Sequence, residues 1–138
     1  MNNRNKLSDG IRLTPEIILT AYKAGIFPMA EYGRDPRLFW VDPKMRGILP
    51  LEDFHVPRSL KKRIRKNPFE MRYDHDFESV IHACAKSTLD RRETWINKEI
   101  IGLYTELFYM GYGHSVECWS GEKLVGGLYG LSMKGVFF

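Results

Sequence analysis

The stretch HSVECWSGEKLVGGLYGLSMKGVFF, residues 114–138, decides the fold that we expect for the C-terminal part of this chain. Two segments of alternating character, at about 114–119 and 124–132, predict two β-strands. The four residues Ser120-Gly121-Glu122-Lys123 lie between them and predict a hairpin loop. The last three residues, Val136-Phe137-Phe138, indicate the start of a further strand.

A hairpin of this kind needs more structure around it. Two strands alone are marginally stable in water, and their apolar face and free edge require further strands or a covering helix. The sequence stops at Phe138, just as the third strand begins. We therefore expect that the chain is cut short within an antiparallel sheet domain.

The residues before the hairpin predict mainly helices. Thr14, followed by Pro15 and Glu16, is a typical helix start and predicts a helix over 15–24 that stops at Gly25. The segment 25–43 is rich in Gly, Pro and aromatic residues, and predicts an extended loop that leads into a short strand at Leu38–Val41. Further predicted elements are a basic helix from Pro57 to about Asn67, a strand over 69–73, a helix after Asp76 and a helix over 98–110 capped by Asn97. The fold class that follows is α+β.

Composition excludes several classes of protein. A hydrophobic content of 43% and a charged content of 28% are those of an ordinary globular protein. No apolar run approaches the ~20 residues of a membrane span, and the polar N-terminus lacks the apolar core of a secretory signal. We expect a cytoplasmic protein that does not enter a membrane. Cys84 and Cys118 lack the spacing of metal ligands, which predicts buried free thiols and no metal site.

Positive charge is concentrated in the segment RSLKKRIRK, residues 58–66, which holds six basic side chains and no acidic one. A helix with this density of cations can neutralise several phosphates and gain from the release of counterions. The alternative is an ordinary solvated surface helix. Because no acidic residue is interleaved to form i,i+4 ion pairs, the segment favours binding of a polyanion.

Aromatic side chains on loops, or on helices flanked by loops, are the second candidate feature: Tyr22, Phe27, Phe39, Trp40, Trp95 and Tyr104. A Trp presented by a polar loop such as RRETWIN can stack on an unpaired base. The alternative role is that of an anchor packed on the core, so the loop context of Trp95 leaves both roles open.

The polar residues of the first C-terminal strand do not indicate a catalytic pair. His114 and Val116 face one side of a strand, whereas Ser115 and Glu117 face the other. Since no nucleophile elbow surrounds Ser115, structural roles are favoured for these residues. The three glycines of LVGGLYG, residues 124–130, indicate a bulge or a close approach of a ligand.

Several motifs together resemble the bacterial leucyl/phenylalanyl-tRNA–protein transferase family. They are GIFPM (25–29), LFWVDPKMRGILPL (38–51), FHVPRSL (54–60), TWIN (94–97), HSVECW (114–119) and LVGGLYG (124–130). The match runs in order from about residue 13 to residue 138. The resemblance implies a polar tail over 1–12, a small N-terminal domain over 13–67, and over 68–138 the first, incomplete half of an N-acetyltransferase-like (GNAT) catalytic domain.

The resemblance also implies roles for individual residues. Trp95 and Tyr104 match residues that hold the 3′-terminal adenosine, and Met29 falls where some members have Trp. Leu128 and Phe137 match residues of the apolar pocket for the transferred side chain. A basic cluster that grips the tRNA acceptor stem is matched by Arg58, Lys62, Arg65 and Lys66. The acidic residue and the glutamine that relay the proton lie beyond position 138 in the family, so the catalytic residues are not assigned here.

The implied function is transfer of Leu, Phe or Met from a charged tRNA to the N-terminal Arg or Lys of a protein, which marks it for degradation. The resemblance implies a monomer and no metal, ATP or coenzyme. Two alternatives stay open: a tRNA-binding module without catalysis, and a degraded gene product without function.

Overall fold

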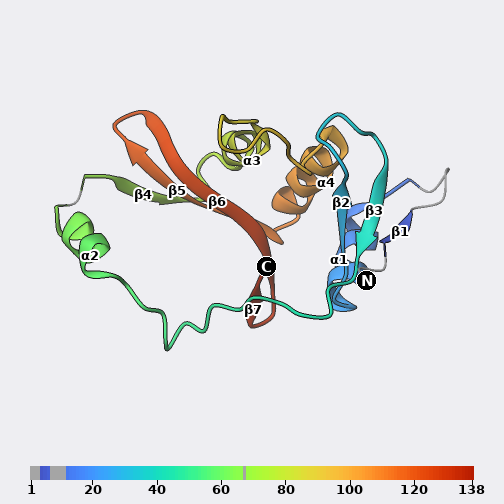
Figure 1. Ribbon diagram of the computed structural model, residues 1–138, viewed down its shortest axis with the longest axis horizontal. Coiled ribbons are helices and arrows are strands. Elements are labelled where there is room, and N and C mark those ends of the chain that lie inside the picture. The colour runs from blue at the N-terminus through green and yellow to red at the C-terminus, as the bar shows by residue number, and fades with distance from the viewer. Residues whose placement is uncertain (1–3, 7–11, 67) are drawn as a thin grey trace.

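The computed structural model describes residues 4–6, 12–66 and 68–138, and the described residues form an α+β structure (Figure 1). The helices are α1 (Pro15–Lys23), α2 (Arg58–Arg65), α3 (Phe77–Ala85) and α4 (Lys98–Tyr109). The strands are β1 (Arg4–Lys6), β2 (Phe27–Ala30), β3 (Leu38–Val41), β4 (Glu70–Tyr73), β5 (Gly113–Ser120), β6 (Lys123–Met133) and β7 (Val136–Phe137). The predicted fold class is confirmed.

The N-terminal sheet has the order β1-β3-β2, with both pairs antiparallel. The strand predicted at Leu38–Val41 is confirmed as β3. The loop predicted over Phe27–Ala30 is wrong, because these residues pair with β3 as strand β2. Pro28 is compatible with this strand since β2 lies at the edge of the sheet, where a missing N–H is tolerated. Within the predicted polar tail Arg4–Lys6 forms β1, and residues 1–3 and 7–11 lie outside the described part.

The C-terminal sheet is antiparallel with the order β4-β5-β6-β7. The predicted hairpin is confirmed as β5 and β6, but its loop is tighter than expected: Ser120 pairs with Lys123, which leaves a two-residue turn. Gly121 permits this turn because it adopts a positive φ of 58°. The predicted bulge is confirmed by a register shift between Cys118 and Trp119, and the predicted further strand is confirmed as β7.

Three of the helices begin where the sequence predicts, each with a side-chain cap. Thr14, Asp76 and Asn97 accept the backbone N–H three residues on, at the starts of α1, α3 and α4. Figure 1 shows α3 and α4 on the same side of the large sheet, with α4 between that sheet and the N-terminal part. None of the helices in the described part is long and apolar enough to cross a membrane.

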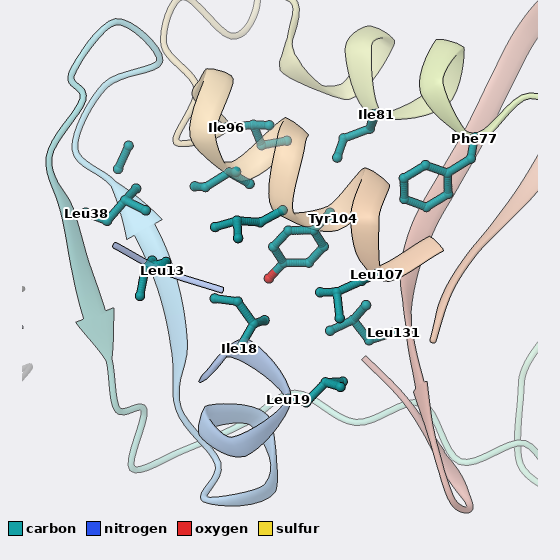
Figure 2. Packing of buried hydrophobic residues seen from close by; sticks show 13 residues of the cluster. Leu13, Ile18, Leu19, Leu38, Phe77, Ile81, Ile96, Tyr104, Leu107 and Leu131 are labelled. Atoms are coloured by element: carbon teal, nitrogen blue, oxygen red, sulfur yellow. The ribbon is translucent and has the colours of Figure 1, made fainter. Parts of the chain in front are cut away.

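One hydrophobic core joins the N-terminal and C-terminal parts, with α4 at its centre (Figure 2). Ile100, Leu103, Tyr104 and Leu107 point into it from successive turns of α4. The remaining buried members are Leu13, Ile18, Leu19, Ala30, Leu38, Phe77, Ile81, Ile96 and Leu131. The core therefore fixes the relative position of the two sheets.

The basic helix α2 stands apart from this core. Figure 1 shows it at the end of a long segment that leaves β3 and runs below the large sheet in this view, on the side away from α3. No described residue of α2 is buried. The helix is therefore held mainly by its chain connections, and nearly all of its surface is open to a partner.

Candidate functional site

Trp95 and Met29, both predicted to contact the terminal adenosine, lie on neighbouring segments. The backbone N–H of Ala30 donates to the carbonyl of Trp95 at 3.2 Å, which joins the end of β2 to the segment that enters α4. Both side chains are half-buried, and Trp95 packs partly against the core. The structure therefore brings these two predicted residues together, with part of each exposed.

Tyr104 occupies a different environment from Trp95. It is only 2% exposed, and its hydroxyl lies 2.5 Å from that of Tyr22 on α1. Figure 2 shows the Tyr104 hydroxyl pointing towards α1. Burial, with the neighbouring Tyr22 and Tyr129, raises the pKa of Tyr104 well above its ordinary value. Tyr104 therefore offers no open ring face for stacking, and its hydroxyl contacts that of Tyr22.

Tyr22 connects Tyr104 to the C-terminal strand. Its ring lies edge-on to Phe138, with the ring centroids 5.4 Å apart, and edge-on to Tyr104 at 6.4 Å. Phe138 exchanges two backbone hydrogen bonds with Leu131, in line with β7. Contacts thus run from a predicted adenosine residue through Tyr22 to the neighbour of the predicted pocket residue Phe137.

Tyr129 lies beside the aromatic group formed by Tyr22, Tyr104 and Phe138, and its hydroxyl has no partner in the described part of the chain. Its ring lies edge-on to Tyr104 at 5.8 Å, and within the described residues its buried hydroxyl has no hydrogen-bond partner. Burial raises the pKa of Tyr129, so the hydroxyl is neutral and can donate a hydrogen bond. No local pattern predicts this buried hydroxyl, because the neighbours of Tyr129 come from α3 and α4.

The predicted pocket residues Leu128 and Phe137 share one face of the large sheet, opposite the helices. Both are 49% exposed. They adjoin at Gly130, where an added Cβ would lie 2.7 Å from Cζ of Phe137 and would also meet the carbonyl oxygen of Phe138. Phe137 therefore lies over a position that only glycine can occupy, and Leu128 is two residues away along β6.

The four predicted tRNA-binding residues lie on α2 or directly after it. Arg58, Lys62 and Arg65 follow each other at spacings of four and three, so they share one side of the helix, and Lys66 is its C-terminal cap. Within the described part of the chain, none of these four side chains forms an ion pair. Figure 1 shows this cluster well apart from α4, the helix that begins shortly after Trp95.

The polar residues of β5 form a structural network instead of a catalytic pair. Glu117 is fully buried and accepts hydrogen bonds from Ser115 Oγ and Trp119 Nε1, each at 2.8 Å. His114 faces the opposite side and contacts Asp74 at 2.8 Å. Because the Ser115 hydroxyl donates to Glu117 and not to His114, no activated serine is formed. The predicted structural roles agree with this geometry.

The described residues offer no cluster of three or more His, Cys, Asp or Glu side chains that could hold a metal ion. Cys84 and Cys118 are free, as predicted, but both are half-buried and not buried as expected. Cys84 lies at the end of α3, where one side faces the surface loop, and Cys118 lies on the open face of β5, where its Sγ contacts Met71 Sδ at 3.2 Å.

Comparisons with known proteins match nearly the whole chain. A family model described as leucyl/phenylalanyl-tRNA protein transferase matches residues 48–138, and one for the N-terminal domain of the same proteins matches residues 12–44. The leucyl/phenylalanyl-tRNA–protein transferase of Rhodospirillum rubrum is 56% identical over 128 residues, and that of Paramagnetospirillum magneticum is 55% identical over 126 residues. These stretches cover 93% and 91% of this chain, but 60% of each relative, so the chain spans about 60% of their length.

Proposed function

Because the chain belongs to the leucyl/phenylalanyl-tRNA–protein transferase family, we propose that it forms part of an aminoacyltransferase which uses charged tRNA as its donor. The transferred amino acids are Leu, Phe and Met, and the acceptor is a protein with N-terminal Arg or Lys that is thereby marked for degradation in the cytoplasm. The observation that carries this proposal is the contact series from Tyr104 through Tyr22 to Phe138. It links Tyr104, which matches a residue of the adenosine site, to Phe138, the neighbour of the proposed pocket residue Phe137.

The tRNA is bound at two places in this proposal. Phosphates of the acceptor stem contact the four cations Arg58, Lys62, Arg65 and Lys66. The terminal adenosine contacts Trp95 and Met29. The exposed position of α2 supports the first contact, since its side chains can reach an RNA surface without rearrangement of the core. The hydrogen bond between Ala30 and Trp95 supports the second, because it fixes both segments.

The transferred side chain lies against Leu128 and Phe137, on the open face of the large sheet. An apolar surface of this kind favours Leu, Phe and Met over charged residues, since a charged side chain would lose its hydration without a partner. Among the apolar amino acids, differences in shape give only ~1–3 kcal/mol of discrimination per methylene. The pocket therefore accepts several unbranched or γ-branched side chains.

The chemical step requires little apparatus. The nitrogen of the acceptor α-amine, which has a pKa of about 8, attacks the carbonyl carbon of the aminoacyl ester. The new C–N bond forms as the ester C–O bond breaks, the amine loses a proton, and the leaving ribose oxygen takes one up. Rate enhancement comes from orienting the two reactants and from donors that stabilise the developing oxyanion. We assign the proton transfer to no residue of this chain.

A tRNA-binding module without catalysis is the second candidate. It is favoured by α2, which presents its cations independently of the aromatic group. Both candidates predict that the chain binds charged tRNA. Only the first predicts that the aminoacyltransferase of which the chain forms part transfers Phe to an Arg-starting peptide.

The test combines a binding assay on this chain with a transfer assay on the proposed enzyme that contains it, both with Phe-charged tRNA. Transfer of Phe to the peptide supports the aminoacyltransferase. Salt-dependent binding without transfer supports the binding module, and absence of both contradicts the two proposals together. Uncharged tRNA and a peptide that starts with Asp are the controls for donor and acceptor.

A further inference from the structure

A pocket of about 480 Å³ lies between the β2–β3 loop and the segment that joins α3 to α4. Its polar lining includes Tyr32, Arg34, Ser87, Arg92, Glu93 and Thr94. None of these residues belongs to the basic cluster of α2 or to the aromatic and apolar residues discussed above. The volume falls within the range of small-molecule sites, roughly 300–1,000 Å³.

The two walls of the pocket are fastened to each other. Asn97 Nδ2 donates to the carbonyl of Asp35 at 2.8 Å, and the N–H of Ala30 donates to the carbonyl of Trp95 at 3.2 Å. Between these two links, Gly33 approaches Thr94 so closely that an added Cβ would lie 2.8 Å from Thr94 Cγ2. Residues 31–37 are therefore held against residues 94–97, although some 60 residues separate them in sequence.

The second wall is also stiffened from within. Arg91 Nη2 donates to the carbonyls of Cys84 and Lys86, at 2.6 and 2.9 Å. Thr88 and Arg91 exchange backbone hydrogen bonds at 2.7 and 3.2 Å. These hydrogen bonds hold the loop after α3 in one conformation. Arg92 follows directly after Arg91, the residue that makes most of them.

The pocket carries a positive excess. In the described part of the chain, Arg34 and Arg92 form no ion pair and no hydrogen bond. Asp35, the acidic neighbour of Arg34, is already engaged by Arg37, whose Nε and Nη2 lie 3.0 and 2.9 Å from its carboxylate oxygens. Glu93 is the acidic side chain of the lining, against two guanidinium groups. An anion is the ligand that this balance of charge favours.

The lining offers the kinds of groups that a nucleotide can use. Guanidinium groups bind phosphate oxygens through paired N–H donors. Tyr32 is 52% exposed, so its ring can stack on a base, and the Ser87 hydroxyl can bond to a sugar or phosphate oxygen. A phosphodiester and one base would together use these groups.

The pocket also adjoins Trp95, because Thr94 and Ile96 on either side of this residue belong to its lining. We propose that the pocket binds the nucleotide that precedes the terminal adenosine of the RNA, with its phosphate at Arg34 and Arg92. This inference rests on the proposed function, which puts the terminal adenosine at Trp95. The 3′ end of the RNA is then held by two consecutive nucleotides, independently of the contacts that α2 makes.

The test uses the 138-residue chain and two probes, the RNA trinucleotide CCA and the nucleoside adenosine, which has no phosphate. Arg34→Gln and Arg92→Gln each lower the affinity for CCA by roughly tenfold, the typical loss for a charged hydrogen bond. Each also reduces the salt dependence of CCA binding, by about 0.7 in the logarithmic slope per lost phosphate contact. Adenosine affinity stays within about twofold of the wild type, because adenosine makes no phosphate contact.

The matched control is Lys123→Gln, which removes one charge at the exposed turn between β5 and β6. It leaves CCA affinity unchanged. Variants of Arg34 and Arg92 that bind CCA as the wild type does, with the same salt slope, overturn the proposal. A wild-type chain that does not bind CCA overturns it as well.

Failure of this inference differs from failure of the proposed function. If charged tRNA binds and is used for transfer while Arg34→Gln and Arg92→Gln have no effect on CCA binding, the function stands and the pocket assignment falls. If CCA binding depends on both arginines but charged tRNA supports no transfer, the pocket assignment stands and the enzyme proposal falls.

Discussion

The carboxylate of Glu117 accepts the backbone N–H of Asp76 at 2.8 Å, which ties the middle of β5 to the N-terminus of α3. The N–H of His75 donates to the same oxygen at 3.1 Å. Glu117 is fully buried, and its side chain has no ion-pair partner among the described residues. The charge is therefore stabilised by four hydrogen-bond donors and by the positive end of a helix.

Replacing Glu117 by Gln lowers the free energy of unfolding by about 2–4 kcal/mol, because the amide cannot accept all four donors and brings a donor of its own. Thermal or urea unfolding followed by circular dichroism measures the change. Glu122→Gln, at the exposed turn, is the matched control and stays within about 0.5 kcal/mol of the wild type.

The same residue predicts a dependence of stability on pH. Burial alone would raise the pKa of Glu117, but its hydrogen bonds to Asp76, Ser115, Trp119 and His75 outweigh burial and hold that pKa below the ordinary value of 4.5. Stability from this group is therefore fully present above pH 4.5 and is lost as the pH falls through the lower folded value. Unfolding free energy measured from pH 6 downwards should fall less steeply in Glu117→Gln. Equal slopes in both proteins would contradict the assignment.

Gly130 and Gly126 of β6 provide a matched pair of glycines. Gly130→Ala places a methyl group against the Phe137 ring and the Phe138 carbonyl, and lowers stability by about 1–3 kcal/mol. Gly126→Ala meets only Cys118 Cβ at 3.7 Å, an ordinary contact, and leaves stability unchanged within about 1 kcal/mol. Chemical denaturation of both variants tests this, and an equal loss in the two would exclude close packing of Phe137 on Gly130.

The hydrogen bond between Tyr22 and Tyr104 predicts energetic coupling. Tyr22→Phe, Tyr104→Phe and the double variant form a cycle whose interaction free energy should be about 0.5–1.5 kcal/mol. Burial raises the pKa of both residues above 10.0, so their contribution to stability is complete below pH 10.0 and declines above it. Unfolding at pH 8 and at pH 11 measures both effects. A coupling of zero would show that the two hydroxyls act separately.

Leu128 and Leu131 lie on the same strand, but Leu128 belongs to the proposed pocket and Leu131 to the hydrophobic core. Leu131 is fully buried, so Leu131→Ala costs about 2–5 kcal/mol of stability. Leu128 is half exposed, so Leu128→Ala costs less than about 1 kcal/mol but weakens binding of a phenylalanyl-adenosine analogue. Calorimetric unfolding and titration with the analogue measure the two properties. Unchanged binding by Leu128→Ala would remove this residue from the proposed pocket.

The cations of α2 are expected to contribute to tRNA binding according to the side of the helix on which they lie. Arg65→Gln, on the side shared with Arg58 and Lys62, lowers tRNA affinity and reduces the salt dependence by about one phosphate contact. Arg63→Gln is the control on the same helix. By helical spacing Arg63 falls outside the side shared by Arg58, Lys62 and Arg65, and its guanidinium lies 5.6 Å from the ring of Phe69. Titrations over a range of salt concentration compare them. Equal losses of tRNA affinity in the two variants would show that the RNA is attracted to the helix as a whole and not to one side of it.

The local pattern of the sequence was sufficient for most of the elements. The starts of α1, α3 and α4 follow from Thr14, Asp76 and Asn97, since a capping side chain acts on residues only three positions away. The β5–β6 hairpin follows from alternation with turn residues between its strands. β2 escaped prediction, because its Pro and Gly neighbours resemble a loop and only pairing with β3 makes it a strand.

The sequence by itself determined the fold class, the cations of α2 and the residues that identify the family, because these depend on composition and on neighbours along the chain. Only the tertiary structure decided that Tyr22 bonds to Tyr104, 82 positions away, that a buried Glu117 holds α3, and that Arg34 and Arg92 line one pocket. Such contacts arise when packing of α4 between the two sheets brings distant segments together, and no local preference encodes them.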